Sequence, residues 1–239
     1  MKRTRETISG ILSILIFAAC LFLQGCSDKS LDIEKNIKIH MERSHAYQKQ
    51  GQFRAATIEA RNIISLDKSR TIGYVRLAEL YFELGNYKGA SAILEQIREI
   101  GSTDIELLLA KSYSRQGKFI SADNALSNYI KTGGDPESIK YKLTLARTLA
   151  GQKRIESAIG ILNTIIEKNP ENIDARILLS TIYLNEKKFE EAETSIKKTL
   201  DAFPTAPEAL YMSARVANYH GEVDKAEKLL SEAVAQLPE

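Results

Sequence analysis

Residues 81–87 read YFELGNY, a tyrosine followed by three residues, a glycine, one residue and an aromatic. The same frame returns at residues 47–53 (YQKQGQF) and 113–119 (YSRQGKF). Three looser copies keep the spacing, at residues 149–155, 183–189 and 217–223. An alanine lies three residues beyond every copy: Ala56, Ala90, Ala122, Ala158, Ala192 and Ala226. These alanines are 34, 32, 36, 34 and 34 residues apart, so one structural unit is repeated six times.

Each copy is predicted to be a pair of helices joined by a tight turn. Apolar residues recur every three to four positions in the second half of a copy, as in Ala158, Ile159, Ile161, Leu162, Ile165 and Ile166. The glycine or lysine between the halves suits the left-handed backbone at a helix end. Prolines stand where the second helix must stop, at Pro170, Pro204 and Pro238. One pair cannot bury its apolar stripe alone, so we expect successive pairs to stack.

Leucines followed by small residues precede the repeated frame, as in Leu77-Ala78 before Tyr81 and Leu109-Ala110 before Tyr113. Together with the period near 34, they resemble the tetratricopeptide repeat, a helix-turn-helix unit of 34 residues. The resemblance implies an all-α, right-handed superhelical solenoid of about six repeats with a concave inner face. The implied domain covers residues 37–239, with repeats at 37–70, 71–102, 103–138, 139–172, 173–206 and 207–239.

The N-terminal segment does not follow the repeat. A short basic stretch precedes an apolar run, ISGILSILIFAACLFL, over residues 8–23, which is the layout of a signal peptide. The sequence Leu23-Gln24-Gly25-Cys26 resembles a bacterial lipobox. The resemblance implies a lipoprotein signal peptide over residues 1–25, cleavage before Cys26 and acylation of the Cys26 thiol. Residues 26–36 are then the lipidated N-terminus and a short spacer.

Lipidation implies anchoring in a bacterial cell envelope, with the protein facing the periplasm. Two or three acyl chains hold a protein stably, because each buried methylene contributes roughly 0.8 kcal/mol. By likeness to enteric lipoproteins, Ser27 favours the outer membrane over the inner one. Two alternatives stay open: the apolar run is an uncleaved membrane anchor, or Cys20 is the acylated residue.

The composition is that of a folded protein without a nucleic-acid partner. Hydrophobic residues make up 44% of the 239 residues and charged residues 27%, which excludes wholesale disorder. The chain has 33 Lys and Arg against 31 Asp and Glu. Residues 1–25 hold three of these cations and one of the acids, which leaves 30 of each sign. A neutral body lacks the electrostatic footprint expected of a nucleic-acid binder, in which Lys and Arg neutralise phosphates.

Constellations typical of catalysis or metal binding are missing from the sequence. His40 and His45 lie five residues apart, not at the i, i+4 spacing that places two ligands on one helical face. His220 is expected at a helix end, where a cation interacts favourably with the helix dipole. No Gly-Lys-Ser or Gly-Lys-Thr follows Gly133-Gly134, so this pair is a loop and not a phosphate site. We therefore predict no catalytic residues, no metal site, no cofactor and no enzymatic activity.

The tetratricopeptide resemblance also implies a binding groove, because the concave face of this family generally holds an extended or helical peptide. The groove positions, carried over residue by residue, are Glu79, Phe82, Glu83, Leu107, Lys111, Arg115, Lys140, Leu143, Arg147, Ile177, Thr181, Asn185, Tyr211, Arg215 and Tyr219. Four basic residues cluster in its middle: Lys111, Arg115, Lys140 and Arg147. They predict a protein or peptide partner with an acidic segment, since charge complementarity steers association and sets register. A merely solvated basic face is the alternative.

A lipobox followed almost at once by tandem repeats resembles the repeat lipoproteins of the exosortase system, with the closest likeness at residues 100–110 and 116–119. This implies a non-catalytic, lipid-anchored periplasmic scaffold in envelope assembly, export or exopolysaccharide-linked secretion. One alternative is a pilotin-like or outer-membrane assembly lipoprotein. Another, from a different class, is a polysaccharide-handling accessory module, suggested by Phe82, Tyr211 and Tyr219.

The two ends of the repeat array carry separate expectations. His40 and Arg43 stand where apolar residues normally pack, so the first repeat is predicted to be a capping repeat with a polar outer face. The sequence stops at residue 239, at the end of a repeat and without a polar capping helix. The last apolar face is then open to self-association or to a continuation of the chain.

Overall fold

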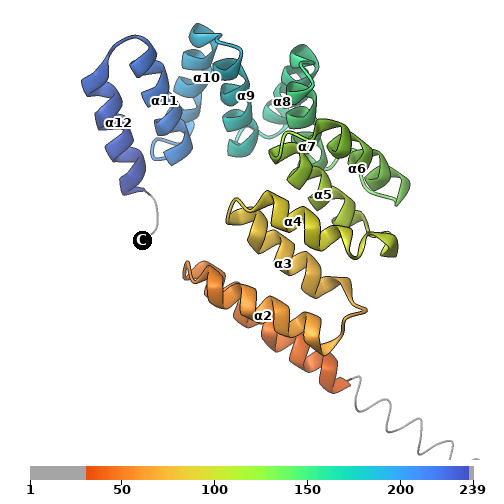
Figure 1. Ribbon diagram of the computed structural model, residues 1–239. Coiled ribbons are helices and arrows are strands. Elements are labelled where there is room, and N and C mark those ends of the chain that lie inside the picture. Colours follow the sequence, from red (N-terminus) through yellow and green to blue (C-terminus); the bar gives the residue numbers. More distant parts are fainter. Residues whose placement is uncertain (1–30, 237–239) are drawn as a thin grey trace, which may run out of the picture. The chain divides into compact units, whose positions relative to one another are not determined.

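The computed structural model describes residues 31–236, and all the regular structure within them is helical, which confirms the predicted all-α class (Figure 1). The predicted signal peptide, Cys26 and Pro238 lie outside the described residues. The chain divides into two compact units, one ending at Leu80 and one starting at Tyr81. The boundary falls inside helix α3 (Thr71–Glu83). No helix in the range 31–236 has the length and apolar character needed to cross a bilayer.

The first unit holds a helix over residues 31–49, helix α2 (Phe53–Leu66) and the first turns of α3. The first helix therefore already covers residues 31–36, inside the segment predicted to be a spacer. Gly73 lets α3 approach α2, since a Cβ at this position would lie 2.8 Å from the Ile64 side chain. The core consists of small and branched apolar residues: Ile37, Ala56, Ala60, Ile63, Leu77, Ala78 and Leu80.

Polar contacts also hold the first unit. The buried Arg76 side chain donates from Nε to Ser44 Oγ (2.9 Å) and from Nη2 to Gln48 Oε1 (2.5 Å). His40 Nδ1 lies 2.5 Å from Glu59 Oε2, with both side chains partly buried. Arg43 is exposed. Of the two polar positions noted in the first repeat, one is therefore paired inside the unit and the other faces solvent.

The second unit continues as helical pairs in chain order (Figure 1). Its helices are α4 (Tyr87–Glu95), the short 3₁₀ helix η1 (Arg98–Ile100), α5 (Thr103–Arg115), α6 (Phe119–Lys131), α7 (Ile139–Gly151), α8 (Ile155–Lys168), α9 (Ile173–Asn185), α10 (Phe189–Ala202), α11 (Pro207–Tyr219) and α12 (Val223–Ala235). The first helices of successive pairs contact one another, α5 with α7, α7 with α9 and α9 with α11. These four helices form what we call the first-helix row.

The turns inside the pairs adopt the left-handed backbone that the repeat predicted. Gly117 has φ of 74° and Gly221 has φ of 77°. Two of the equivalent turns use lysine, with φ of 65° at Lys153 and 58° at Lys187. Helix α8 ends two residues before Pro170 and α10 two residues before Pro204, so these two predicted breaks are confirmed.

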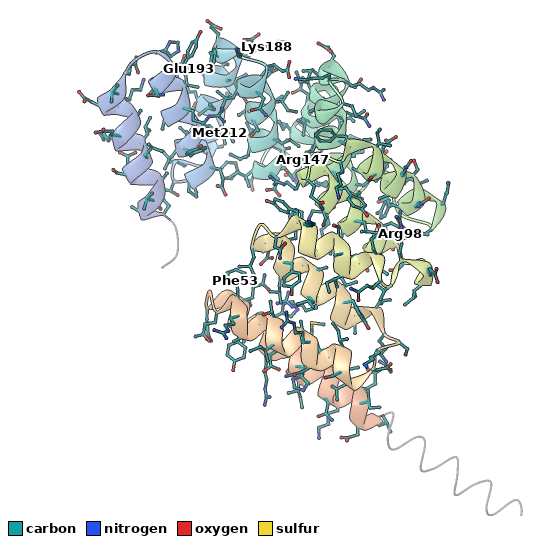
Figure 2. All side chains as sticks on the ribbon, viewed as in Figure 1. Phe53, Arg98, Arg147, Lys188, Glu193 and Met212 are labelled. Atoms are coloured by element: carbon teal, nitrogen blue, oxygen red, sulfur yellow. The ribbon has the colours of Figure 1, made fainter. Side chains whose placement is uncertain are left out.

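Neighbouring first helices bury the apolar stripes of α8 and α10, but not that of α12. Leu162 and Ile165 of α8 are buried together with Leu178 and Ile182 of α9. The next layer packs Ile196 of α10 against residues of α9 and α11, including Met212, which is labelled in Figure 2. On α12 the equivalent stripe, Val223, Leu230 and Val234, is 54%, 40% and 66% exposed. Self-association through this face stays a prediction.

A charged cluster ties α4, η1 and α5 together. Arg98 donates two hydrogen bonds to the buried Glu106 carboxylate, at 2.9 and 3.0 Å, and a third to Glu95 at 3.1 Å. Tyr113 also donates its hydroxyl to Glu95. Burial, followed by this hydrogen bond, raises the pKa of Tyr113 to about 12. Glu106 is satisfied by a two-point contact, which is how a carboxylate can be buried.

Candidate functional site

A cavity of about 420 Å³ runs along the first-helix row inside the second unit. It is lined by residues of five first helices, from the last turn of α3 to the first turn of α11: Phe82, Lys111, Arg115, Lys140, Leu143, Thr144, Arg147, Ile173, Asp174, Ile177, Leu178 and Glu208. Its size falls in the range of ligand sites in proteins, about 300–1,000 Å³. We call it the cationic cavity, because its four basic side chains outnumber its two carboxylates.

Two of the basic side chains come from α5. Lys111 and Arg115 are four residues apart, so they share one face of this helix. Lys111 Nζ lies 4.8 Å from the centre of the Phe82 ring, and the Arg115 guanidinium carbon lies 5.9 Å from the centre of the Tyr87 ring. Cation–π contacts of this kind orient a basic side chain.

Arg147 of α7, labelled in Figure 2, is the most perturbed cation of the cavity. Its burial, and then the like charge of Arg115, lower the pKa of the guanidinium to about 10. Asp174 opposes the shift weakly. Arg147 is still protonated at neutral pH, so a charge is held where the surroundings disfavour it. Perturbed groups of this sort gather at functional sites.

Lys140 stands in the first turn of α7, two residues after the N-cap Ser138. A helix N-terminus carries a partial positive charge, so a lysine here is electrostatically disfavoured. The equivalent positions of α9 and α11 hold Asp174 and Glu208, which follow the rule. Within residues 31–236, no carboxylate lies within 4.0 Å of the charged nitrogens of Arg115, Lys140 or Arg147.

The rest of the lining is apolar. Leu143 of α7 and Ile173, Ile177 and Leu178 of α9 supply apolar lining. Thr144 donates its hydroxyl to the Lys140 carbonyl at 2.8 Å, which satisfies that hydroxyl inside its own helix. The arrangement can bind a ligand with charged ends and an apolar middle.

The cavity brings together seven of the fifteen predicted groove residues: Phe82, Lys111, Arg115, Lys140, Leu143, Arg147 and Ile177. The other eight do not line it: Glu79, Glu83, Leu107, Thr181, Asn185, Tyr211, Arg215 and Tyr219. Glu79 belongs to the first unit. The Thr181 hydroxyl bonds back to the Ile177 carbonyl at 2.7 Å.

The three aromatic residues behind the polysaccharide alternative do not meet in the cavity. Tyr219 stacks on Phe189 of α10, with ring centres 3.5 Å apart and planes 14° from parallel. Tyr211 is 51% exposed on α11, and only Phe82 lines the cavity. The sequence pattern placed all three on one face because it took account of position in the repeat but not of the neighbouring second helix.

Five lining residues were not predicted: Thr144, Ile173, Asp174, Leu178 and Glu208. A signal for two of them was present. Asp174 and Glu208 follow Lys140 by 34 and 68 residues, one and two repeat periods, so they occupy the same repeat position. Carrying that position through all the repeats would have found both.

Comparisons with known proteins agree with the repeat pattern. Three sequence profiles described as tetratricopeptide repeat match residues 73–100, 149–199 and 177–239. These segments are tetratricopeptide repeats. The chain is also 30% identical over 200 residues to the TPR repeat-containing protein YpiA of Bacillus subtilis, an alignment covering 80% of this chain. It spans only 46% of that relative's length.

Solved structures show the same fold. A tetratricopeptide repeat protein of Parabacteroides merdae matches with a TM-score of 0.73 at 14% identity, over 83% of this chain and 78% of the other. PilF of Pseudomonas aeruginosa matches with a TM-score of 0.59 at 13% identity, over 83% and 90% of the two chains. Tetratricopeptide repeats generally mediate protein–protein interaction and typically form non-catalytic scaffolds. Among residues 31–236 no cluster of three or more His, Cys, Asp or Glu side chains could hold a metal ion.

Proposed function

We propose that this protein is a non-catalytic tetratricopeptide scaffold that binds an acidic segment of a protein partner in the cationic cavity. The observation that carries the proposal is the placement of Arg115, Lys140 and Arg147 in one cavity with no carboxylate at ion-pair distance. Arg115 and Lys140 are exposed, as the cations of a solvated basic face would be. Arg147 differs, because it is partly buried beside a second arginine, which supports a bound anion as the missing partner.

Two of these cations stand where folding alone disfavours them. Lys140 opposes the dipole of α7, and Arg147 is desolvated next to Arg115. Residues that break a local rule without a structural gain typically belong to functional sites. A carboxylate between α5 and α7 would relieve both penalties, because it would supply the charge that the cavity lacks.

We further propose a place in the bacterial cell envelope. The support is the lipobox-like sequence over residues 23–26 after an apolar run, with Cys26 as the site of acylation. The scaffold would then face the periplasm, with the outer membrane favoured by Ser27, and serve envelope assembly, export or exopolysaccharide-linked secretion. The likeness to exosortase-system lipoproteins supports the last of these roles, and a pilotin-like or outer-membrane assembly lipoprotein remains the alternative.

A peptide-binding measurement tests the scaffold. The full chain in detergent micelles is titrated against a fluorescein-labelled hexapeptide of two glutamates, two leucines and two glutamates, with anisotropy as the readout. We expect the double variant Arg115→Glu, Arg147→Glu to lose binding. The matched control is Lys131→Glu, Lys168→Glu, which changes the net charge equally at exposed positions outside the cavity. Equal binding by both double variants would refute the proposed site.

Labelling tests the anchor separately. Cells given an alkyne analogue of palmitate should label the wild-type protein, and Cys26→Ala should abolish the label and release the protein from the membrane fraction. Cys20→Ala is the matched control and should change neither. If Cys20→Ala lost the label and Cys26→Ala kept it, Cys20 would be the acylated residue.

A further inference from the structure

We propose that the cationic cavity recognises a bipolar segment: an acidic side chain between α5 and α7, an apolar side chain in the middle, and a basic side chain held by α9 and α11. This inference rests on the proposed function and narrows its ligand from an acidic segment to one with this order of charges. It concerns the two carboxylates of the lining, which the acidic-segment proposal leaves without a role.

The charges of the cavity are separated by helix. All four cations belong to α5 and α7, namely Lys111, Arg115, Lys140 and Arg147. Both carboxylates belong to the next helices of the first-helix row, Asp174 on α9 and Glu208 on α11. The charge of the cavity lining therefore changes from positive to negative once along the first-helix row, between α7 and α9. A ligand that crosses this boundary meets opposite charges at its two ends.

The change of sign occurs at one repeat position. Lys140, Asp174 and Glu208 are 34 residues apart in succession, and each lies in the first turn of its helix. The repeat geometry thus aims three equivalent side chains into one cavity, and only their charges differ. Asp174 and Glu208 are favourable at a helix N-terminus in any case. Lys140 is not, so the difference in charge is not a requirement of the helices.

The opposite charges do not neutralise each other inside the cavity. Across the described part of the chain, neither Asp174 nor Glu208 has a lysine, arginine or histidine nitrogen within 4.0 Å. Asp174 influences Arg147 only weakly, less than burial and Arg115 do. Both signs are therefore available to a ligand.

The distances suit a short peptide. Packed helices lie about 8–10 Å apart, and an extended chain advances about 3.3 Å per residue. One step along the first-helix row therefore corresponds to about three residues of an extended ligand. Leu143 of α7 and Ile177 of α9 line the cavity at the change of sign, where they can contact an apolar side chain between the two charged ones.

The test compares three fluorescein-labelled hexapeptides that share a central pair of leucines. The bipolar peptide has two glutamates before and two lysines after the leucines, the acidic peptide has glutamates at both ends, and the basic peptide has lysines at both ends. Each is titrated against the full chain in detergent micelles. From the strength of exposed charge pairs, we expect the bipolar peptide to bind about 5-fold more tightly than the acidic peptide. The basic peptide should bind least.

The decisive variant is Asp174→Lys, Glu208→Lys, which extends the basic lining along the whole row. We expect it to invert the preference, so that the acidic peptide binds more tightly than the bipolar one. Misfolding of the cavity is expected to lower the affinity, and the matched control tests whether added lysines raise it wherever they are placed. The matched control is Asp123→Lys, Asp201→Lys, at exposed positions of second helices outside the cavity, which should keep the original order.

The outcomes separate the two proposals. Equal binding of the bipolar and acidic peptides, lost in Arg115→Glu, Arg147→Glu, would overturn the charge order and leave the acidic-segment scaffold standing. Binding that ignores the arginine substitutions, or no binding of any peptide, would overturn both. The Asp174→Lys, Glu208→Lys variant could also keep the preference for the bipolar peptide. The basic end of the peptide would then bind outside α9 and α11, and the proposed charge order would be overturned.

Discussion

We expect Arg147 to lower the free energy of unfolding, so replacing it with methionine should stabilise the protein. The pKa of its guanidinium is lowered to about 10, first through burial and then through Arg115. A depressed pKa in a base means that the protonated form is disfavoured in the folded state, and the penalty applies at every pH below about 10. Neutral pH lies well inside this range, so Arg147 is charged and the penalty is present in full.

The magnitude follows from the same shift. One pKa unit corresponds to about 1.4 kcal/mol, so the lowering of the Arg147 pKa to about 10 sets an upper bound of about 3 kcal/mol. Arg147 retains partial exposure, and water screens the charge, so we expect a gain of about 1 kcal/mol in the free energy of unfolding. Methionine has a similar unbranched stem and keeps the packing of the side chain.

The assay is thermal and urea unfolding of Arg147→Met, followed by circular dichroism at 222 nm. A gain of 1 kcal/mol should raise Tm by about 2–4 °C for a protein of this size. The matched control is Arg215→Met, the same repeat position two hairpins later, where the side chain is exposed and the change should stay within about 0.5 kcal/mol. A lower Tm for Arg147→Met, or equal shifts in both variants, would refute the reasoning. Binding of the acidic hexapeptide should weaken in Arg147→Met even as Tm rises.

Three further predictions concern the fold. Lys187→Gly should stabilise the fold by about 0.5–1 kcal/mol, because Lys187 holds a left-handed backbone (φ 58°) that glycine adopts freely. Gly117→Ala should lower Tm, because Gly117 has φ of 74°, although there is open space for a Cβ. A lower Tm for Lys187→Gly or a higher Tm for Gly117→Ala would contradict the argument. Leu162→Ala should cost about 3–5 kcal/mol in urea unfolding because the side chain is fully buried, whereas Ile120→Ala, at 79% exposure, should be near neutral. Burial, followed by the hydrogen bond to a carboxylate, raises the pKa of Tyr113 to about 12. The neutral phenol therefore contributes stability that is complete below pH 10 and is lost as pH rises through 12. Tyr113→Phe should make stability fall less steeply over this range, and an unchanged pH dependence would count against the argument.

Much of the fold was predictable from the sequence because the same sequence pattern occurs in every repeat and forms the same local structure each time. The alternation of tyrosine, glycine or lysine, and alanine recurs with a period near 34, and each copy folds into a helical pair with a left-handed turn. The prolines after α8 and α10 end those helices for a local reason, the missing amide hydrogen. These features depend on neighbours in the chain, so no tertiary knowledge was needed.

The candidate site was only half predictable. Position in the repeat found Arg115 and Arg147, because first-helix residues of this type face the inner row. It did not show that Tyr219 stacks on Phe189 of the neighbouring second helix, a contact between side chains 30 residues apart. Nor did it reveal Asp174 and Glu208 as part of the same lining.

By itself, the sequence determined a helical repeat with a lipobox-like N-terminal segment and a set of basic residues in the first helices. Only the tertiary structure decided which of those residues share one cavity and that Arg147 is desolvated beside Arg115. The physical reason is the distance along the chain between the residues that interact. Helix boundaries and turns arise from interactions within a few residues, whereas the depth and charge of a cavity arise from side chains on helices that meet only after the repeats have stacked.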